Sequence, residues 1–211
     1  MTNTPTAAPR GRLYVIAAPS GAGKTSLVKA LLARRPGIEV SVSYTTRKPR
    51  PNEVDGRDYC FVDRAAFERL IAEDALLEHA LVFDNFYGTS RARVEGALAA
   101  GRDVILEIDW QGARQVRARL PDCATVFILP PSHAALERRL HDRRTDDAAV
   151  IARRLRDAAA DISHWREFDY VIVNDRFEEA LAALERIVAR DGAAWVATRP
   201  GLEALAAELL G

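Results

Sequence analysis

The feature that most constrains this chain is a glycine-rich turn at residues 18–25, Ala-Pro-Ser-Gly-Ala-Gly-Lys-Thr, between two regular segments. An apolar run, Leu13–Ala17, precedes the turn, and Ser26–Leu32 follows it with the leucine spacing of a helix. Strand, glycine-rich turn and helix is the setting in which a P-loop binds phosphate. A helix N-terminus offers unpaired N–H groups and the positive end of its dipole to an anion. The turn therefore predicts a site for a nucleoside triphosphate.

Each residue type in the turn suits that chemistry. Gly21 and Gly23 allow the backbone to curl close around phosphate oxygens, where a Cβ would intrude. Lys24 supplies a mobile positive charge for the β- and γ-phosphates, and the Thr25 hydroxyl is a ligand for Mg²⁺. The predicted nucleotide-binding loop comprises Ala18, Pro19, Ser20, Gly21, Ala22, Gly23, Lys24 and Thr25. The strict motif begins with glycine, where this chain has Ala18, and the loop alone does not say which reaction follows.

Apolar strands alternate with helices along most of the chain. Continuous apolar runs predict buried strands at 13–17, 103–108, 124–129 and 170–173, and amphipathic segments predict helices at 25–35, 110–120, 134–141 and 177–190. Strands that are apolar throughout belong to a parallel sheet covered on both faces. The sequence thus predicts an α/β fold with a parallel-sheet core covered by helices.

The stretch from about 40 to 90 departs from that rhythm. It contains short alternating strands, expected at 38–44, 58–62 and twice within 76–89 around a turn at Asp84-Asn85. Asp63 and Ser90 stand where they would cap helices. We interpret this stretch as a small inserted β-rich subdomain. Because it follows the helix after the loop, we expect it beside the carboxyl ends of the core strands, where α/β folds bind ligands.

Composition limits the partners of the chain. Its 211 residues include 30 basic and 30 acidic side chains, so no overall field draws it to nucleic acid or to a membrane. No apolar stretch has the length of a membrane span, and residues 1–11 read as a flexible tail without a signal core. We therefore expect a cytoplasmic protein. Cys60 and Cys123 lie among apolar neighbours and are expected to be small buried fillers.

Several motifs occur in the order typical of one family. They are 18–25, Ser41–Arg50, Glu53, Gly56, Tyr59, Phe61-Val62, Tyr87–Ser90, Glu107–Gly112, Pro130–Ser132 and Val173–Asp175. From Leu13 to Arg190 the chain resembles guanylate kinases of the bacterial type. The resemblance implies phosphorylation of GMP, and of dGMP, by ATP with Mg²⁺. It also implies core residues 12–39, 91–137 and 157–211, a GMP-binding subdomain at about 40–90 and a lid at about 138–156.

The resemblance also implies roles for individual residues. A clamp for the GMP phosphate would consist of Arg47, Arg50, Tyr59 and Tyr87, and the guanine would be read by Ser43, Glu78, Thr89 and Asp109. Arg139, Arg143 and Arg154 would be the lid and transfer arginines, and Asn174 would contact the adenine of ATP. Three positions depart from the family pattern: Ala18 in the loop, Glu107 where many relatives have Asp, and Arg144 in the lid.

Two other functions remain open at this stage. A related kinase acting on a phosphorylated ribose would keep the loop but would lack the guanine-reading set of Ser43, Glu78 and Thr89. A non-catalytic binding module would keep the phosphate clamp but would lose Lys24 and Thr25. Both alternatives therefore conflict with residues that are present. The sequence does not indicate whether the chain works as a monomer or as a homo-oligomer.

Overall fold

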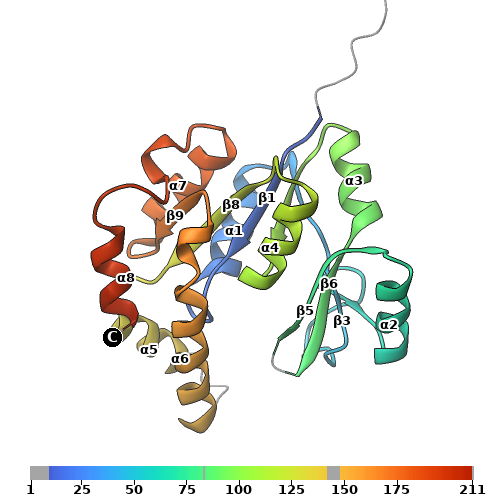
Figure 1. The fold of residues 1–211 in the computed structure, drawn as a ribbon, viewed down its shortest axis with the longest axis horizontal. Helices are drawn as coiled ribbons and strands as arrows, with labels where there is room; N and C mark the ends of the chain where they lie inside the picture. The colour runs from blue at the N-terminus through green and yellow to red at the C-terminus, as the bar shows by residue number, and fades with distance from the viewer. Residues whose placement is uncertain (1–9, 83, 142–147, 211) are drawn as a thin grey trace, which may run out of the picture. The chain divides into compact units, whose positions relative to one another are not determined.

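The computed structural model describes residues 10–82, 84–141 and 148–210 (Figure 1). The chain forms two compact units, which we describe separately. Through its described residues, the first comprises 10–13, 37–106 (except residue 83) and 114–123, and the second comprises 14–36, 107–113, 124–141 and 148–210. Most of the predicted inserted stretch thus lies in the first unit, and the glycine-rich loop lies in the second.

The parallel sheet contains five strands in the order β2-β7-β1-β8-β9. They are β1 (Leu13–Ala17), β2 (Ile38–Val40), β7 (Asp103–Glu107), β8 (Ala124–Leu129) and β9 (Tyr170–Val173). In the second unit β1 pairs in parallel with β8, Val15 opposite Thr125, and β8 pairs in parallel with β9. Every residue of β1 and of β8 is buried, as expected for strands covered on both faces. The predicted parallel α/β core is confirmed.

Helices follow these strands as the sequence predicts. They are α1 (Lys24–Arg34), α4 (Trp110–Arg119), α5 (His133–His141), α6 (Ala148–Ile162), α7 (Phe177–Val188) and α8 (Leu202–Leu210), with short 3₁₀ turns η1 (Trp165–Glu167) and η2 (Ala193–Trp195). Helices α1 and α7 pack together, and Arg34 forms ion pairs with Glu178 and Glu185 across that contact. None of the helices within the described residues is long and apolar enough to cross a membrane.

A second, four-stranded sheet lies in the first unit in the order β4-β3-β6-β5. Its strands are β3 (Tyr44–Thr45), β4 (Cys60–Phe61), β5 (Leu76–Val82) and β6 (Asn85–Ser90), and the helices α2 (Arg64–Ala72) and α3 (Arg91–Ala99) belong to the same unit. Asp63 caps α2 by accepting a bond from the Ala66 N–H, and Ser90 caps α3 through the Arg93 N–H. The ring of Phe67 on α2 stacks on Phe86 of β6, with centroids 5.3 Å apart.

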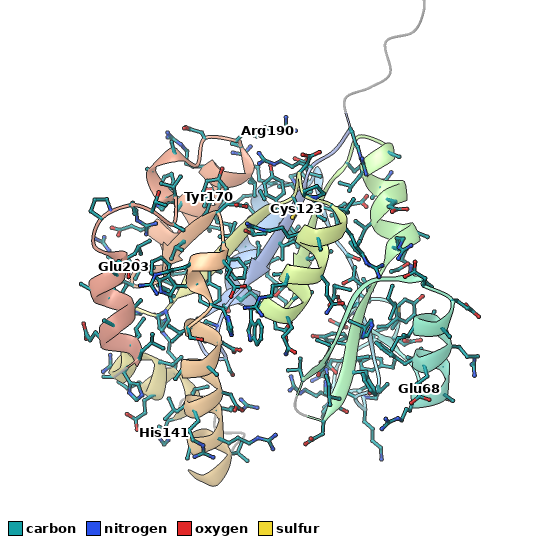
Figure 2. All side chains as sticks on the ribbon, viewed as in Figure 1. Glu68, Cys123, His141, Tyr170, Arg190 and Glu203 are labelled. Atoms are coloured by element: carbon teal, nitrogen blue, oxygen red, sulfur yellow. The ribbon has the colours of Figure 1, made fainter. Side chains whose placement is uncertain are left out.

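Three predicted elements have different bounds. The strand expected at 38–44 is broken, because β2 joins the parallel sheet and β3 joins the four-stranded sheet, with residues 41–43 between them. The strand expected at 58–62 shortens to Cys60–Phe61. The sequence also predicts a long helix from the polar residues 143–147 to about Trp165, but this helix, α6, ends at Ile162, and Trp165 begins η1. Figure 2 draws the described side chains, among them Cys123, which is buried just before β8 as predicted.

Candidate active site

The glycine-rich loop has the backbone shape that its sequence predicts. Gly21 and Gly23 have φ angles of 91° and 95°, in the left-handed region that only glycine enters freely. Gly23 is the residue before α1, so the loop ends at a helix N-terminus. The ammonium of Lys24 donates to the Ile108 carbonyl at 3.0 Å. The lysine is therefore held at the carboxyl end of β7, and the loop has the form of an anion cradle.

The first helical turn also provides oxygen ligands. The Thr25 hydroxyl donates to the Glu107 carboxylate at 3.1 Å, and Thr25 is exposed. A hydroxyl beside a carboxylate is the hard oxygen set that suits Mg²⁺. Among the described residues there is no group of three or more His, Cys, Asp or Glu side chains that could hold a metal ion. Magnesium ions are usually bound by one or two protein oxygens, with phosphate oxygens and water as the other ligands, and these two side chains fit that pattern.

Asn174 lies directly behind the loop. It follows β9, is 5% exposed, and donates its side-chain Nδ2 to the Ala22 carbonyl at 2.7 Å. Its own main-chain carbonyl accepts a bond from Nη2 of Arg139 at 2.8 Å. The other terminal nitrogen of Arg139, Nη1, is buried and has no hydrogen-bond partner among the described residues. Arg139 and Asn174, both predicted site residues, are thus brought to the loop.

Asp109 ends the segment after β7 and caps helix α4. One carboxylate oxygen accepts the Gly112 N–H at 2.8 Å, and the other accepts from the Gln111 side chain at 3.1 Å. A carboxylate at this position satisfies N–H groups of the first helical turn. The second unit therefore contains Asp109, predicted to read guanine, together with Lys24 and Asn174.

A second carboxylate, Asp161 on α6, belongs to the same neighbourhood. Burial, aided by the negative charges of Asp109 and Asp157, raises the pKa of Asp161 to about 7. The positive charge of Lys24 and a hydrogen bond from Trp110 act in the opposite direction. An acid of this pKa changes its charge near neutral pH, and perturbed groups of this kind gather at functional sites. The local sequence around Asp161 gives no signal of this, since helical acids are usually solvated.

The predicted acceptor clamp is a network of side chains in the first unit. The Arg47 guanidinium donates to Glu53 at 2.8 Å and lies 5.3 Å from the ring centre of Tyr59. The second oxygen of Glu53 accepts the Arg50 N–H at 2.7 Å. The bond from Arg47 is the main reason why the pKa of Glu53 is lowered, and the same bond raises the pKa of Arg47. One carboxylate therefore orients the Arg47 side chain and fixes the main chain at Arg50.

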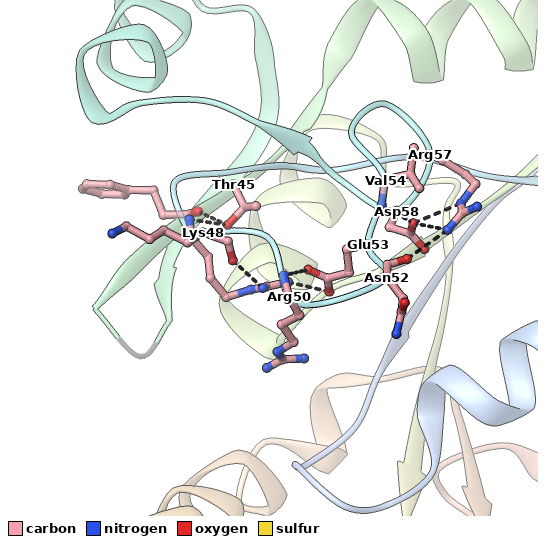
Figure 3. A network of polar contacts seen from close by, with 10 residues as sticks. Thr45, Lys48, Arg50, Asn52, Glu53, Val54, Arg57 and Asp58 are labelled. Carbon is pink, nitrogen blue, oxygen red and sulfur yellow. Dashed lines mark hydrogen bonds and ion pairs between the residues drawn. The ribbon is translucent and has the colours of Figure 1, made fainter. Parts of the chain in front are cut away.

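The loop that holds this clamp is ordered by turns. The Glu53 N–H donates to the Arg50 carbonyl, and between them Asn52 has a φ of 74°. A type II turn requires a positive φ at its third position, which asparagine tolerates, and it commonly has proline at its second position. In Figure 3, Asp58 binds the Val54 N–H and the Arg57 side chain, and the Arg50 side chain extends away from Glu53. The loop is thus fixed while one arginine remains extended.

The aromatic residues of the predicted clamp lie in the same unit. The Tyr59 and Tyr87 rings meet edge to face with centroids 6.0 Å apart. Tyr87 also contributes a hydrogen bond that raises the pKa of Arg47. The structure therefore brings together Arg47, Tyr59 and Tyr87, with Arg50 following in the same loop.

A buried acid lies on the neighbouring strands. Glu78 of β5 is 3% exposed and faces Thr89 of β6 in the antiparallel register. The Thr89 hydroxyl donates to the Glu78 carboxylate at 2.6 Å. A carboxylate is rarely buried without partners, so this pair requires a structural or functional reason. Because the single hydroxyl proton of Thr89 points to Glu78, Thr89 has no proton to donate elsewhere in this arrangement, whereas Ser43 is half-buried.

The structure leaves one predicted site residue undescribed and corrects the prediction for one cysteine. Arg143 lies outside the described residues, as does Arg144, whereas Arg154 lies half-buried on α6. Cys60 is not a buried filler: it is half-buried, and its sulfur accepts from Arg93 at 3.3 Å.

Comparison with known proteins decides the family. The family model described as guanylate kinase matches residues 10–191. The chain belongs to the guanylate kinase family. The guanylate kinase of Methylococcus capsulatus is 58% identical over 202 residues, covering 96% of this chain and 99% of that protein. The guanylate kinase of Escherichia coli K12 is 53% identical, covering 85% of this chain and 87% of that protein.

A solved structure agrees with these sequence relatives. The crystal structure of guanylate kinase from Anaplasma phagocytophilum has a TM-score of 0.73 and 36% sequence identity, and 88% of each chain is covered. Membership of the guanylate kinase family confirms the resemblance stated from the motifs. Sequence reasoning assigned no role to Glu53, Glu107 or Asp161. For Glu107 the signal was its place two residues before Asp109 at the end of a buried strand.

Proposed function

We infer that this chain is an enzyme that transfers the γ-phosphoryl group of ATP to GMP, giving ADP and GDP. Family membership supports this reaction, and dGMP is a second acceptor that we propose. The observation that carries the choice of acceptor is the buried pair of Glu78 and Thr89 in the unit that also holds the Arg47–Glu53 clamp. We propose that the reaction takes place in the cytoplasm, where ATP is available.

The donor nucleotide would be held mainly by backbone. The N–H groups at the start of α1 face the phosphates, and the glycines with positive φ give them room. Lys24 would leave the Ile108 carbonyl for the β- and γ-phosphates, since a phosphate offers a stronger charge-assisted bond than a carbonyl does. We propose that Thr25 ligates Mg²⁺ and that Glu107 orients it. When bound, the ion neutralises charge on the phosphates.

The phosphate of the acceptor nucleotide would be bound by side chains and not by the main chain. Two unit charges of the same sign 4 Å apart repel by about 4 kcal/mol at an effective dielectric near 20, so both nucleotides require cations. Arg47 and Arg50 present planar forks that match phosphate oxygens, which lysine would match less well. Tyr59 and Tyr87 would add hydroxyl donors. No general base is required, because the phosphate of GMP is itself an anionic nucleophile.

Base choice follows from Glu78. Guanine offers N1–H and an N2 amino group as donors, and one carboxylate accepts both. Adenine has no hydrogen at N1, so it would leave this buried carboxylate with an unmatched oxygen. Sites of this design discriminate by roughly 10⁴–10⁵-fold. Thr89 holds the carboxylate in place by its 2.6 Å bond, and we propose that Ser43 and Asp109 complete the contacts to the base.

Water competes with GMP as a nucleophile. Arginines that reach the transferring group only after both substrates bind would suppress hydrolysis of ATP. We assign this part to Arg139, Arg143 and Arg154, as the resemblance implies. Arg139 supports the assignment because its buried Nη1 has no hydrogen-bond partner among the described residues, so this donor has no acceptor in the arrangement seen here.

A coupled assay of ADP release tests the proposed function. The protein is given ATP, Mg²⁺ and in turn GMP, dGMP, AMP, CMP or UMP. We expect turnover with GMP and, more weakly, with dGMP, and rates with the other three that stay near the rate without acceptor. Preference for AMP or a pyrimidine nucleotide would overturn the assignment of the acceptor. Phosphopeptide binding without turnover would indicate a binding module instead.

A further inference from the structure

Asn174 makes three polar contacts, and each joins a different segment of the second unit. Its N–H donates to the Leu129 carbonyl of β8 at 2.8 Å. Its side-chain Nδ2 donates to the Ala22 carbonyl of the donor loop at 2.7 Å. Its main-chain carbonyl accepts from Arg139 of α5 at 2.8 Å. Asn174, which is 5% exposed, therefore binds the loop through its side chain, and it binds the core sheet and a predicted transfer arginine through its main chain.

The orientation of this side chain is fixed by chemistry. A main-chain carbonyl can only accept a hydrogen bond, so the NH₂ group and not the oxygen must face Ala22. The contact is also close: a Cβ added to Gly23 would lie 2.4 Å from Asn174 Nδ2. Gly23 therefore serves two purposes, since it permits a φ of 95° and leaves room for the asparagine amide.

We propose that Asn174 is a positioning residue whose side chain holds the donor loop in its phosphate-binding shape, while its main-chain carbonyl holds Arg139 beside the loop. This role rests on the proposed function, but it differs from the adenine contact that the family resemblance implies. An adenine contact acts on the base of the nucleotide. A residue that shapes the loop acts on the triphosphate, whatever base is attached to it.

The physical reason lies in the Ala22 carbonyl. This buried residue is flanked by two glycines, which have the greatest conformational freedom of all residues. Without the Asn174 amide the carbonyl loses its partner, and a buried acceptor without a partner favours a shift of the backbone. The N–H groups of the loop would then no longer converge on one anion. The same loss would leave a space beside Gly23.

Hydrogen–deuterium exchange of the loop in the nucleotide-free protein is the first test. We expect the amides of residues 20–25 to exchange about tenfold faster in Asn174→Ala than in the unsubstituted protein, the factor that loss of one hydrogen bond produces. Unchanged exchange would overturn the proposal. If Asn174→Ala does not fold, the isosteric Asn174→Asp replaces the amide donor with an acceptor, and the same increase is expected.

Inorganic tripolyphosphate resembles the phosphates of ATP but has no base, so it distinguishes a role of Asn174 in shaping the loop from a contact with adenine. Its inhibition constant against ATP and the KM for ATP should both rise in Asn174→Ala, each by about tenfold, with the KM for GMP unchanged. A rise in the KM for ATP with unchanged inhibition by tripolyphosphate would overturn the loop role in favour of the adenine contact. The matched control is Thr125→Ala, another buried polar residue of the same unit. It should lower stability without changing either constant.

The two proposals fail in different ways. If the unsubstituted protein does not phosphorylate GMP, the proposed function is wrong, whereas the exchange measurement on the loop still gives a result. If GMP is phosphorylated and the loop exchanges equally in both proteins, only the role of Asn174 is wrong.

Discussion

The proposed donor loop, residues 18–25, and the proposed acceptor loop, residues 47–53, would bind phosphate by different means. In the donor loop the backbone provides the site: two glycines with positive φ, a helix N-terminus and the carbonyl of Ala22 fixed by Asn174. In the acceptor loop side chains provide it, since Glu53 binds the Arg47 guanidinium and the Arg50 N–H. Phosphate binding by the donor loop should therefore depend on the shape of the main chain, and phosphate binding by the acceptor loop should depend on side-chain charge.

The difference matches what each site has to recognise. A triphosphate is long and carries the same groups in every nucleotide, so an array of N–H groups is sufficient to bind it. A nucleoside monophosphate has one phosphate and must be told apart from others by its base. That requires side chains with defined donors and acceptors, such as Glu78 with Thr89. Substitutions can test this division between shape and charge.

The largest effect is expected from Lys24→Ala, which removes the one side-chain cation that the donor loop itself supplies. Turnover should fall by about 10³-fold, which is typical for loss of a charge that stabilises the transferring group. GMP binding should persist, because the clamp lies in the other unit. Steady-state kinetics and calorimetry with GMP measure the two effects. Retained turnover would contradict the donor role.

The next largest effect is expected from Glu78→Gln. The amide keeps the size of the side chain but presents an N–H₂ group where guanine also has donors, so the KM for GMP should rise by about 10²-fold. The preference for GMP over AMP should shrink, while the KM for ATP stays constant. Kinetics with both acceptors provide the measurement, and an unchanged preference would show that this carboxylate does not read the base.

A smaller effect is expected from Glu53→Gln, which weakens the orientation of Arg47 without removing either arginine. The KM for GMP should rise about tenfold and kcat should change less, because a charged hydrogen bond is roughly twice as strong as a neutral one. The matched control is Glu68→Gln, since Glu68 pairs with Arg64 on the exposed side of α2 (Figure 2). Equal effects of both substitutions would argue against orientation by Glu53.

The smallest effect on turnover is expected from Asp161→Asn, which instead changes stability. The pKa of Asp161 in the folded protein, about 7, lies above the usual value for aspartate, which is about 4. Between these two pH values the folded protein therefore binds more protons than the unfolded chain does. Its free energy of unfolding should therefore fall as pH rises from about 4 to about 7. The asparagine variant should be more stable at pH 8, by on the order of 4 kcal/mol, and equally stable near pH 4.

Denaturant unfolding at both pH values measures this difference. Asp157→Asn is the matched control on the same helix, and it should show a much smaller dependence on pH. Stability curves of Asp161→Asn that run parallel to those of the unsubstituted protein would indicate that Asp161 stays ionised in the folded state.

Local pattern predicted most of the fold because most elements carry a local signal. The buried strands 124–129 and 170–173, and the caps Asp63 and Ser90, were all evident from neighbouring residues. The strand expected at 38–44 was wrong because alternation records which side of a strand is apolar and not which sheet it joins. Its two ends pair with different sheets, and residues 41–43 connect them.

Long-range contacts explain what the sequence could not predict at the site. The bond from Asn174 to Ala22 joins residues 152 positions apart, and the environment of Asp161 combines helix α6 with residues 24 and 109. Glu53 lies close to Arg47 in sequence, but its role depends on the turn between them. The clamp and guanine-reading residues came from the family resemblance, and their roles remain predictions that the variants above test.

The turn at Asn52 has a practical consequence for anyone who wishes to redirect this protein to another acceptor. Its φ of 74° suits few amino acids besides glycine, asparagine and aspartate. A mutagenesis library that randomises positions 51 and 52 would consist mostly of strained loops, whatever base was sought. Positions 43, 78 and 89 are better choices for randomisation, because substitutions there leave the turn at residues 50–53 unchanged.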